Sequence, residues 1–213
     1  MDQAAATRTH LLSLRARIAL ARQARDLLDD KRKQLMEELR TASRVALEAS
    51  DALEHATTGA VGTLRFAEAL EGPEAVASAA VAASGEIFLE AGVESIAGVR
   101  VPRIERAAVG RPRAGRGYSV APTGAVIDAV ADAFEGTLEL IVQVAADEIR
   151  LRRLATEIGA TMRRVNALDH VLIPALEDEY RRVRAVLDER EREDQFRLRR
   201  VKAALASGEE TAA

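Results

Sequence analysis

Two long ladders of apolar residues, one near each end of the chain, constrain the fold more than any other feature. Within each ladder, apolar side chains recur at steps of three, four or seven residues, which is the spacing of a helical stripe. The residues expected in the seam are Leu11, Leu14, Ile18, Leu28, Leu35, Leu39 and Leu53 near the start, and Leu151, Ile158, Met162, Val165, Leu172, Leu176 and Val183 near the end. Such stripes need burial, so we predict a protein dominated by α-helix, with a long antiparallel coiled coil of its N- and C-terminal helices.

The composition agrees with long helices and excludes several other classes. Aromatic residues make up 3% of the 213 residues and charged residues 31%, as in coiled coils. The chain has no Cys, so it can form neither disulfides nor thiolate metal sites. Its net charge of −3 argues against a dedicated nucleic-acid binder. No apolar run approaches the roughly 20 residues of a membrane helix, so we expect a cytoplasmic protein without direct membrane insertion.

The chain divides into segments at its glycine and proline residues. Thr7 or Thr9 can cap the first helix, Gly59 is expected to end it, and Thr123 can cap the second. Between them, β-branched residues that alternate with polar ones indicate a β-hairpin. The expected segments are a helix over 1–58, a mixed middle region over 59–122 with a hairpin at 85–107 and an Arg/Gly/Pro loop at 110–117, a helix over 123–206, and a disordered tail over 207–213.

Polar residues and a proline interrupt the seam. Pro174 should kink or split the second helix, because proline removes a backbone N–H inside it. Charged residues at seam positions allow two interpretations: they fix the register of the coiled coil, or their charged ends reach past a loose seam to water. These residues are Arg25, Arg32, Asp169 and Glu179.

No group of residues carries a catalytic pattern. The histidines His10, His55 and His170 have no second ligand at metal-binding spacing. No glycine-rich phosphate loop is present. We therefore predict no catalytic site, cofactor or metal. The loop arginines Arg111, Arg113 and Arg116 are compatible with RNA, but without interleaved aromatic residues we favour a solvated loop.

Both helical segments carry a cluster of basic residues near the chain termini. In a helical hairpin these clusters would lie side by side, which costs free energy unless something acidic faces them. A negative partner surface is therefore expected at this end, with a solvated tip as the alternative. The cationic residues are Arg8, Arg15, Arg17, Arg22, Arg25, Arg197, Arg199, Arg200 and Lys202.

Two segments near the C-terminus resemble a known family. Residues 163–174 (RRVNALDHVLIP) and 187–202 (LDEREREDQFRLRRVK) are similar to the signature of the D subunit of V-type and archaeal-type (V/A) rotary ATPases. Thr7-Arg8 and the leucines that follow also match, and Gly72-Pro73-Glu74 matches less firmly. The chain departs from the family at Ala6, Ala24, Asp29-Asp30 and Asp169, where Pro, Gly, Lys and Glu are usual.

This resemblance implies a rotor-shaft subunit of the central stalk with no nucleotide site of its own. The tip with both termini would enter the hexamer of catalytic A and B subunits. The middle region would hold the F subunit and meet the socket subunit (C/d type) above the proteolipid ring. Such a shaft, on the cytoplasmic face of the membrane, couples ATP hydrolysis or synthesis to rotation of the ring and to proton or sodium transport. Two alternatives stay open: a self-associating coiled-coil scaffold or chaperone-like protein, and a nucleic-acid module that uses the Arg-rich loop.

Overall fold

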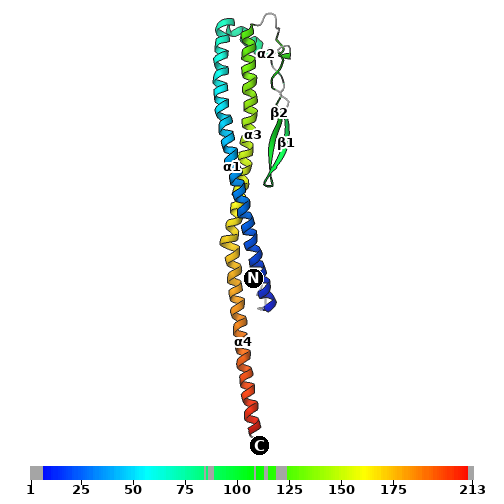
Figure 1. Cartoon of the computed structure of the whole chain (residues 1–213), viewed down its shortest axis with the longest axis vertical. Coiled ribbons are helices and arrows are strands. Elements are labelled where there is room, and N and C mark those ends of the chain that lie inside the picture. Colours follow the sequence, from blue (N-terminus) through cyan, green and yellow to red (C-terminus); the bar gives the residue numbers. More distant parts are fainter. Residues whose placement is uncertain are drawn as a thin grey trace. The chain divides into compact units, whose positions relative to one another are not determined.

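The computed structural model describes residues 7–83, 85, 89–107, 109–112, 115–118 and 124–210. Helix α1 (Arg8–Glu71) is followed by α2 (Pro73–Ala82), strands β1 (Leu89–Ile96) and β2 (Val99–Ala107), α3 (Ala125–Ala167), a π-helical turn (Leu168–Leu172) and α4 (Ile173–Glu210) (Figure 1). The predicted fold class is confirmed: long helices at both ends and a small hairpin between them. The chain folds into two compact units, the first formed by residues 1–32 and 160–213 and the second by residues 33–159.

Helix α1 is longer than predicted. It begins after Thr7, whose Oγ1 accepts a hydrogen bond from the N–H of His10 at 3.2 Å. The expected end at Gly59 is wrong, because the helix continues to Glu71. A glycine inside a helix costs only about 1 kcal/mol relative to alanine, which is too little to stop a long helix. The helix ends instead at Gly72, whose φ of 87° is not helical, and Pro73 begins α2.

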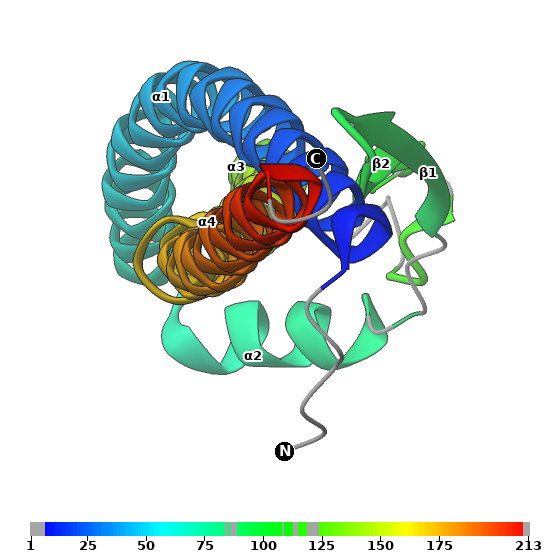
Figure 2. The ribbon, with the colours of Figure 1, turned by 90° about the horizontal axis from the view of Figure 1, so that it is seen from below.

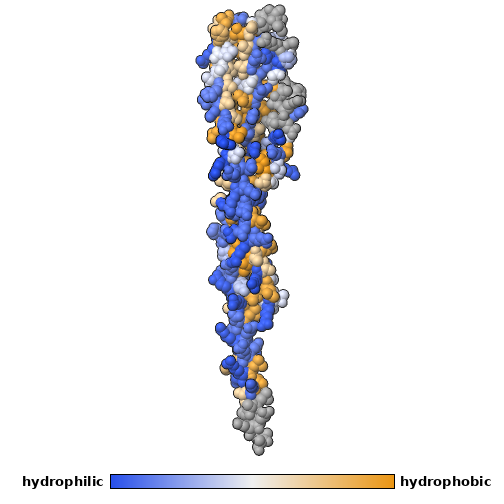
Figure 3. All heavy atoms as spheres, in the orientation of Figure 1, coloured by the Kyte–Doolittle hydropathy of each residue, from blue (hydrophilic) through white to orange (hydrophobic). Residues whose placement is uncertain are grey.

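In the first unit, the start of α1 packs against α4. The two helices lie side by side in both ribbon views (Figures 1 and 2). Between them lies a narrow apolar core of Leu14, Ile18, Ala21, Ile173, Leu176 and Val183. Charged and polar residues cover much of the face shown in Figure 3. A thin seam with polar outer faces is the structure that the apolar ladders require.

In the second unit, the rest of α1 packs against α3, and the hairpin covers part of this pair. Val99 and Val101 of β2 join Leu35, Ala42 and Leu154 in one buried cluster. The two strands pair antiparallel, with Ile96 opposite Val99. Ala97 and Gly98 connect them, both with positive φ, as in tight two-residue turns. Within this unit, helix α2 lies crosswise to α1 and α3 (Figure 2).

The second long helical segment, formed by α3 and α4, contains a π-helical turn where a simple kink was expected. Residues Leu168–Leu172 form a π turn, and the N–H of Ile173 bonds to the carbonyl of Leu168, five residues earlier. Pro174 follows immediately, as the second residue of α4. A π turn holds one residue more than a regular turn. The interruption expected at Pro174 therefore takes the form of an inserted residue.

This insertion explains one of two errors in the predicted seam. Leu172 is 42% exposed and Ile173 is buried in its place, eight positions after the buried Val165 instead of seven. Met162 is also wrongly placed: it is 49% exposed, and the neighbouring Thr161 is fully buried. The apolar pattern favoured methionine over threonine, but the helical period places Thr161 on the buried face.

The remaining seam residues are buried or partly buried. Those in the buried class are Leu14, Ile18, Leu35, Val165, Leu176 and Val183. Those at intermediate exposure are Leu11, Leu28, Leu39, Leu53, Leu151 and Ile158. Helix α4 reaches Glu210 and so passes the end expected at residue 206, while the cap expected at Thr123 lies outside the described residues. Among the described residues, no helix combines the length and apolar character needed to cross a membrane.

Candidate functional site

Three ion pairs and one histidine–carboxylate hydrogen bond join α1 to α4 and to the π turn in the first unit. As the residue number rises along α1, the number of the partner on α4 or the π turn falls, so the helices run antiparallel. The pairs are Arg8–Glu191 (2.5 Å), His10–Glu179 (3.2 Å), Arg22–Glu177 (2.5 Å) and Arg25–Asp169 (3.5 Å). Exposed ion pairs contribute only about 0–1 kcal/mol each. They select this register more than they hold the helices together.

The register corrects the expected position of the basic clusters. Residues 8–25 of α1 lie beside the acidic residues between Asp169 and Glu191, not beside residues 197–202. The physical reason is charge complementarity, because two basic stretches side by side would repel one another. Arg197 pairs with Glu193 in its own helix at 4.0 Å. Within the described part of the chain, no ion pair is formed by Arg15, Arg17, Arg199, Arg200 or Lys202.

Beyond Glu191, α4 continues past the first described residue of α1 (Figure 1). We call residues 192–203 the projecting segment. Its side chains Phe196, Leu198 and Val201 are each more than half exposed and lie among arginines. We treat this segment as the candidate contact surface of the first unit, because it combines exposed apolar side chains with cations. The sequence indicated only the cations here, because these apolar residues fall outside the ladder.

The polar seam residues Arg25, Arg32, Asp169 and Glu179 were expected either to fix the register or to reach past the seam to water, and they do not all behave alike. Arg25 and Glu179 make cross-helix pairs, with Asp169 and His10. Arg32 instead pairs with Asp29 of its own helix at 2.7 Å. Two pairs can therefore fix the register, while Arg32 contributes a local contact.

In the second unit, Arg116 is buried in a cluster of carboxylates, which corrects the expectation of a solvated loop at this position. It is 2% exposed. Its Nε and Nη2 donate to the two carboxylate oxygens of Glu135 at 3.1 and 2.8 Å, and Nη2 also donates to Asp132. Asp128 lies 3.7 Å from Nη1. The bonds to Glu135 are the main cause of the raised pKa of Arg116, so the residue stays charged.

Tyr118 adds a second attachment between this loop and α3. Its hydroxyl donates to Oδ1 of Asp128 at 2.7 Å. Burial is the main cause that raises the pKa of Tyr118, and the bond to Asp128 adds to it. Asp128, Asp132 and Glu135 recur at steps of four and three, on one face of α3. That spacing after an Arg-rich loop was the sequence signal that could have revealed the cluster; Arg113 lies outside the described residues.

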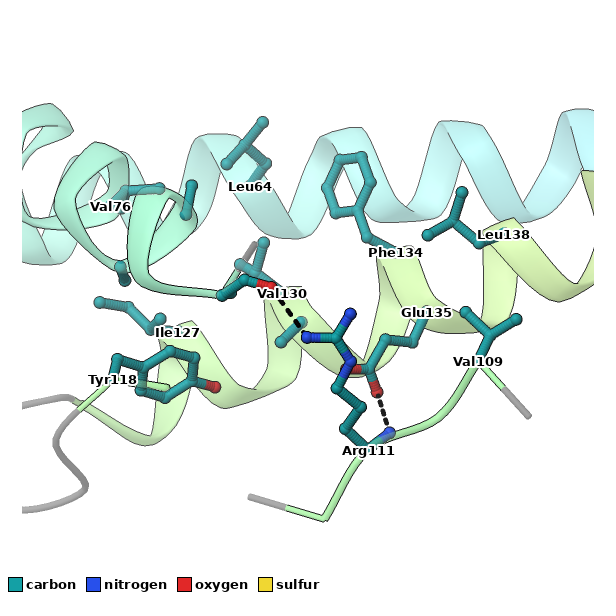
Figure 4. Close-up of a pocket in the computed structure, with 14 residues that line it drawn as sticks. Leu64, Val76, Val109, Arg111, Tyr118, Ile127, Val130, Phe134, Glu135 and Leu138 are labelled. Atoms are coloured by element: carbon teal, nitrogen blue, oxygen red, sulfur yellow. Dashed lines mark hydrogen bonds between the residues drawn. The ribbon is translucent and has the colours of Figure 1, made fainter. Parts of the chain in front are cut away.

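A cavity of about 380 Å³ lies next to this cluster, with Arg111, Tyr118 and Glu135 among the residues that line it (Figure 4). His55 and His170 are exposed and do not line it. Among the described residues, no three His, Asp or Glu side chains gather as metal ligands would.

Comparison with known proteins gives a consistent result. The family model for the ATP synthase D subunit matches residues 10–203. The V-type ATP synthase D subunit of Deinococcus deserti is 40% identical over 203 residues, which cover 95% of this chain and 89% of the relative. The protein of the same name from Thermus thermophilus is 38% identical over 218 residues, covering 98% and 92%. That of Anaeromyxobacter dehalogenans is 40% identical over 203 residues, covering 95% and 97%.

Proposed function

Because this chain belongs to the ATP synthase D-subunit family, we propose that it is the rotor shaft in the central stalk of a V-type ATP synthase. In this role it couples ATP hydrolysis or synthesis in the hexamer of A and B subunits to rotation of the membrane ring. The rotation in turn drives, or is driven by, proton or sodium transport. The chain contributes no catalytic group, and we expect no ATP hydrolysis by the isolated protein.

The projecting segment is the observation that carries this proposal. It extends α4 past its ion-paired partner and exposes three large apolar side chains among cations. A rotor tip must turn inside a collar that presents a changing series of surfaces. Apolar contacts are non-directional, and exposed ion pairs are weak, so both kinds of contact can be exchanged during rotation. We therefore propose that the projecting segment, and not both termini together, enters the collar of the catalytic hexamer.

The seam of the first unit suits a shaft that bears torque. Small and medium side chains such as Ala21 allow α1 and α4 to approach closely, and buried leucines pack between the two helices. The charged pairs that cross the seam oppose sliding of one helix along the other, because a shift would separate every pair at once. Within the assembly, we propose that the second unit contacts the F subunit and the socket subunit above the proteolipid ring.

Site-directed cross-linking tests the rotor role. Because this chain has no cysteine, an introduced cysteine is the only thiol that it can contribute to a disulfide. A Phe196→Cys variant is assembled with A and B subunits that carry one introduced cysteine in the collar. If the chain rotates, disulfide formation stops ATP hydrolysis by the complex and reduction restores it. Leu12→Cys on the exposed face of α1 serves as a matched control for labelling. Full ATP hydrolysis by the cross-linked complex would refute the rotor role.

The exposed apolar tip also fits a self-associating scaffold, which is the second candidate. In that case the purified chain would form a stable oligomer that persists when A and B subunits are added. Sedimentation of the chain with and without these subunits separates the two functions. We expect the chain to leave any self-associated form and to sediment with the hexamer.

A further inference from the structure

The cavity of the second unit has the size and lining of a binding site for a small molecule. It opens between the end of α1, helix α2 and the start of α3 (Figure 4). Its volume of about 380 Å³ lies at the lower end of the range of roughly 300–1,000 Å³ for ligand pockets. Its walls are mostly apolar and include Leu64, Val76, Ile127, Val130 and Phe134. Such walls select a ligand with an apolar body.

Arg111 supplies a fixed cation to this apolar cavity. Its backbone N–H donates to Glu135 at 3.2 Å, and its Nη1 donates to the carbonyl oxygen of Ala83 at 3.0 Å. The guanidinium lies against Gly85, where a Cβ atom would come within 2.5 Å of Nη1. In Figure 4 the guanidinium points into the cavity, toward Phe134. These contacts hold the cation in place before any ligand arrives.

Among the residues that the structure describes, the carboxylates near Arg111 pair with Arg116 instead. Both oxygens of Glu135 accept hydrogen bonds from Arg116, and Asp128 and Asp132 also pair with Arg116. Among the described residues, no carboxylate lies within ion-pair distance of the Arg111 guanidinium. A guanidinium has five N–H donors, and only Nη1 has an acceptor in the described part of the chain. The donors that have no acceptor among the described residues favour a carboxylate, because charge-assisted bonds are about twice as strong as neutral ones.

We propose that this cavity binds a small monocarboxylate with an apolar body, of the class of medium-chain fatty acids. The carboxylate pairs with Arg111, and the hydrocarbon chain packs against Val76, Ile127 and Phe134. This binding site is separate from the proposed rotor function and does not depend on it.

Three eight-carbon probes test the proposal on the full chain: octanoate, octan-1-ol and octylamine. Methyl resonances of Val76, Ile127, Val130 and Leu138, which line the cavity, report binding by NMR. Octanoate should give saturable shifts at these methyl groups and bind about tenfold or more tightly than octan-1-ol, the difference expected for a hydrogen bond to a charged group. Octylamine should not saturate. Equal binding of all three probes, or no saturation by octanoate, would overturn the proposal.

Variants separate the head group from the apolar body. Arg111→Gln should reduce octanoate affinity to the level of octan-1-ol, while Arg103→Gln on the hairpin should change nothing. Ala131→Leu fills the cavity and should abolish binding of both probes. Gly85→Ala keeps the charge of Arg111 but displaces its guanidinium, so it should lower octanoate affinity as Arg111→Gln does. It therefore tests the role of Arg111 even if Arg111→Gln folds poorly. Unchanged octanoate affinity in Gly85→Ala and Arg111→Gln would refute the role of Arg111. None of these assays measures rotation, so their failure would leave the rotor proposal untouched.

Discussion

Leu14→Ala tests whether the seam between α1 and α4 holds the first unit together. Leu14 is fully buried and packs in the cluster that includes Ile18, Ile173 and Leu176. Leucine-to-alanine changes in protein cores cost about 2–5 kcal/mol, and the cost rises with the cavity left behind. Two helices with one narrow seam can close part of that cavity. We therefore expect a loss of about 2–3 kcal/mol in the free energy of unfolding, in the lower half of that range.

Thermal unfolding followed by far-UV circular dichroism measures this loss. For a chain of this size, about 1 kcal/mol shifts Tm by roughly 2–4 °C, so Leu14→Ala should lower Tm by about 4–12 °C. Leu12→Ala is the matched control, because Leu12 lies two residues away and is 65% exposed. It should change the free energy of unfolding by less than about 0.5 kcal/mol. If both variants unfold at the same temperature, α1 does not pack on α4 through Leu14 and the seam is wrong.

Three further changes test polar groups. Thr161 is fully buried, and its hydroxyl has no hydrogen-bond partner among the described residues, so Thr161→Val should raise the free energy of unfolding in urea by about 1–2 kcal/mol. Thr156→Val, at an exposed site, should have little effect, and a destabilised Thr161→Val would contradict the reasoning. Arg116→Met removes the guanidinium that bonds three carboxylates and should cost about 3 kcal/mol or more in the free energy of unfolding at pH 7. An unchanged free energy of unfolding would contradict this reasoning. Burial raises the pKa of Asp147, so the folded state binds the proton of this carboxyl group more tightly than the unfolded state does. The protonated group therefore favours the folded state below the unfolded pKa of about 3.9. This contribution to stability is lost as the pH rises. Asp147→Asn should therefore raise Tm at pH 7 and leave it nearly unchanged at about pH 3, and the same shift at both would refute this explanation.

The long helices could be predicted because their signal repeats along the chain. Leu14, Ile18 and Leu35 are buried where the helical period placed them. Predictions from the helical period and from helix-breaking residues failed at two places, where the local backbone differed from what the sequence pattern indicated. Gly59 was too weak a helix breaker to end α1 inside a long helix, and the π turn before Pro174 moved the buried position from Leu172 to Ile173.

The candidate sites were harder to predict because they depend on contacts between distant segments. The alignment of the first unit brings together pairs such as Arg8–Glu191, whose partners lie at opposite ends of the sequence. The apolar ladders indicate the two faces but not their alignment, which is why the two basic clusters were expected together. The cavity needs residues from α1, α2 and α3 at once. No spacing within one segment indicates that Leu64 and Ile127 share a wall.

The extra residue in the π turn has a practical consequence for protein engineering. A heptad step carried from Val165 through Leu168–Leu172 places Leu172 in the seam, where the structure buries Ile173. A chimera that joins residues 173–202 to an uninterrupted helix would therefore turn Ile173, Leu176 and Val183 by about 100° away from their groove. A graft of α4 should pack against α1 only when it includes the five residues before Ile173, which form the π turn.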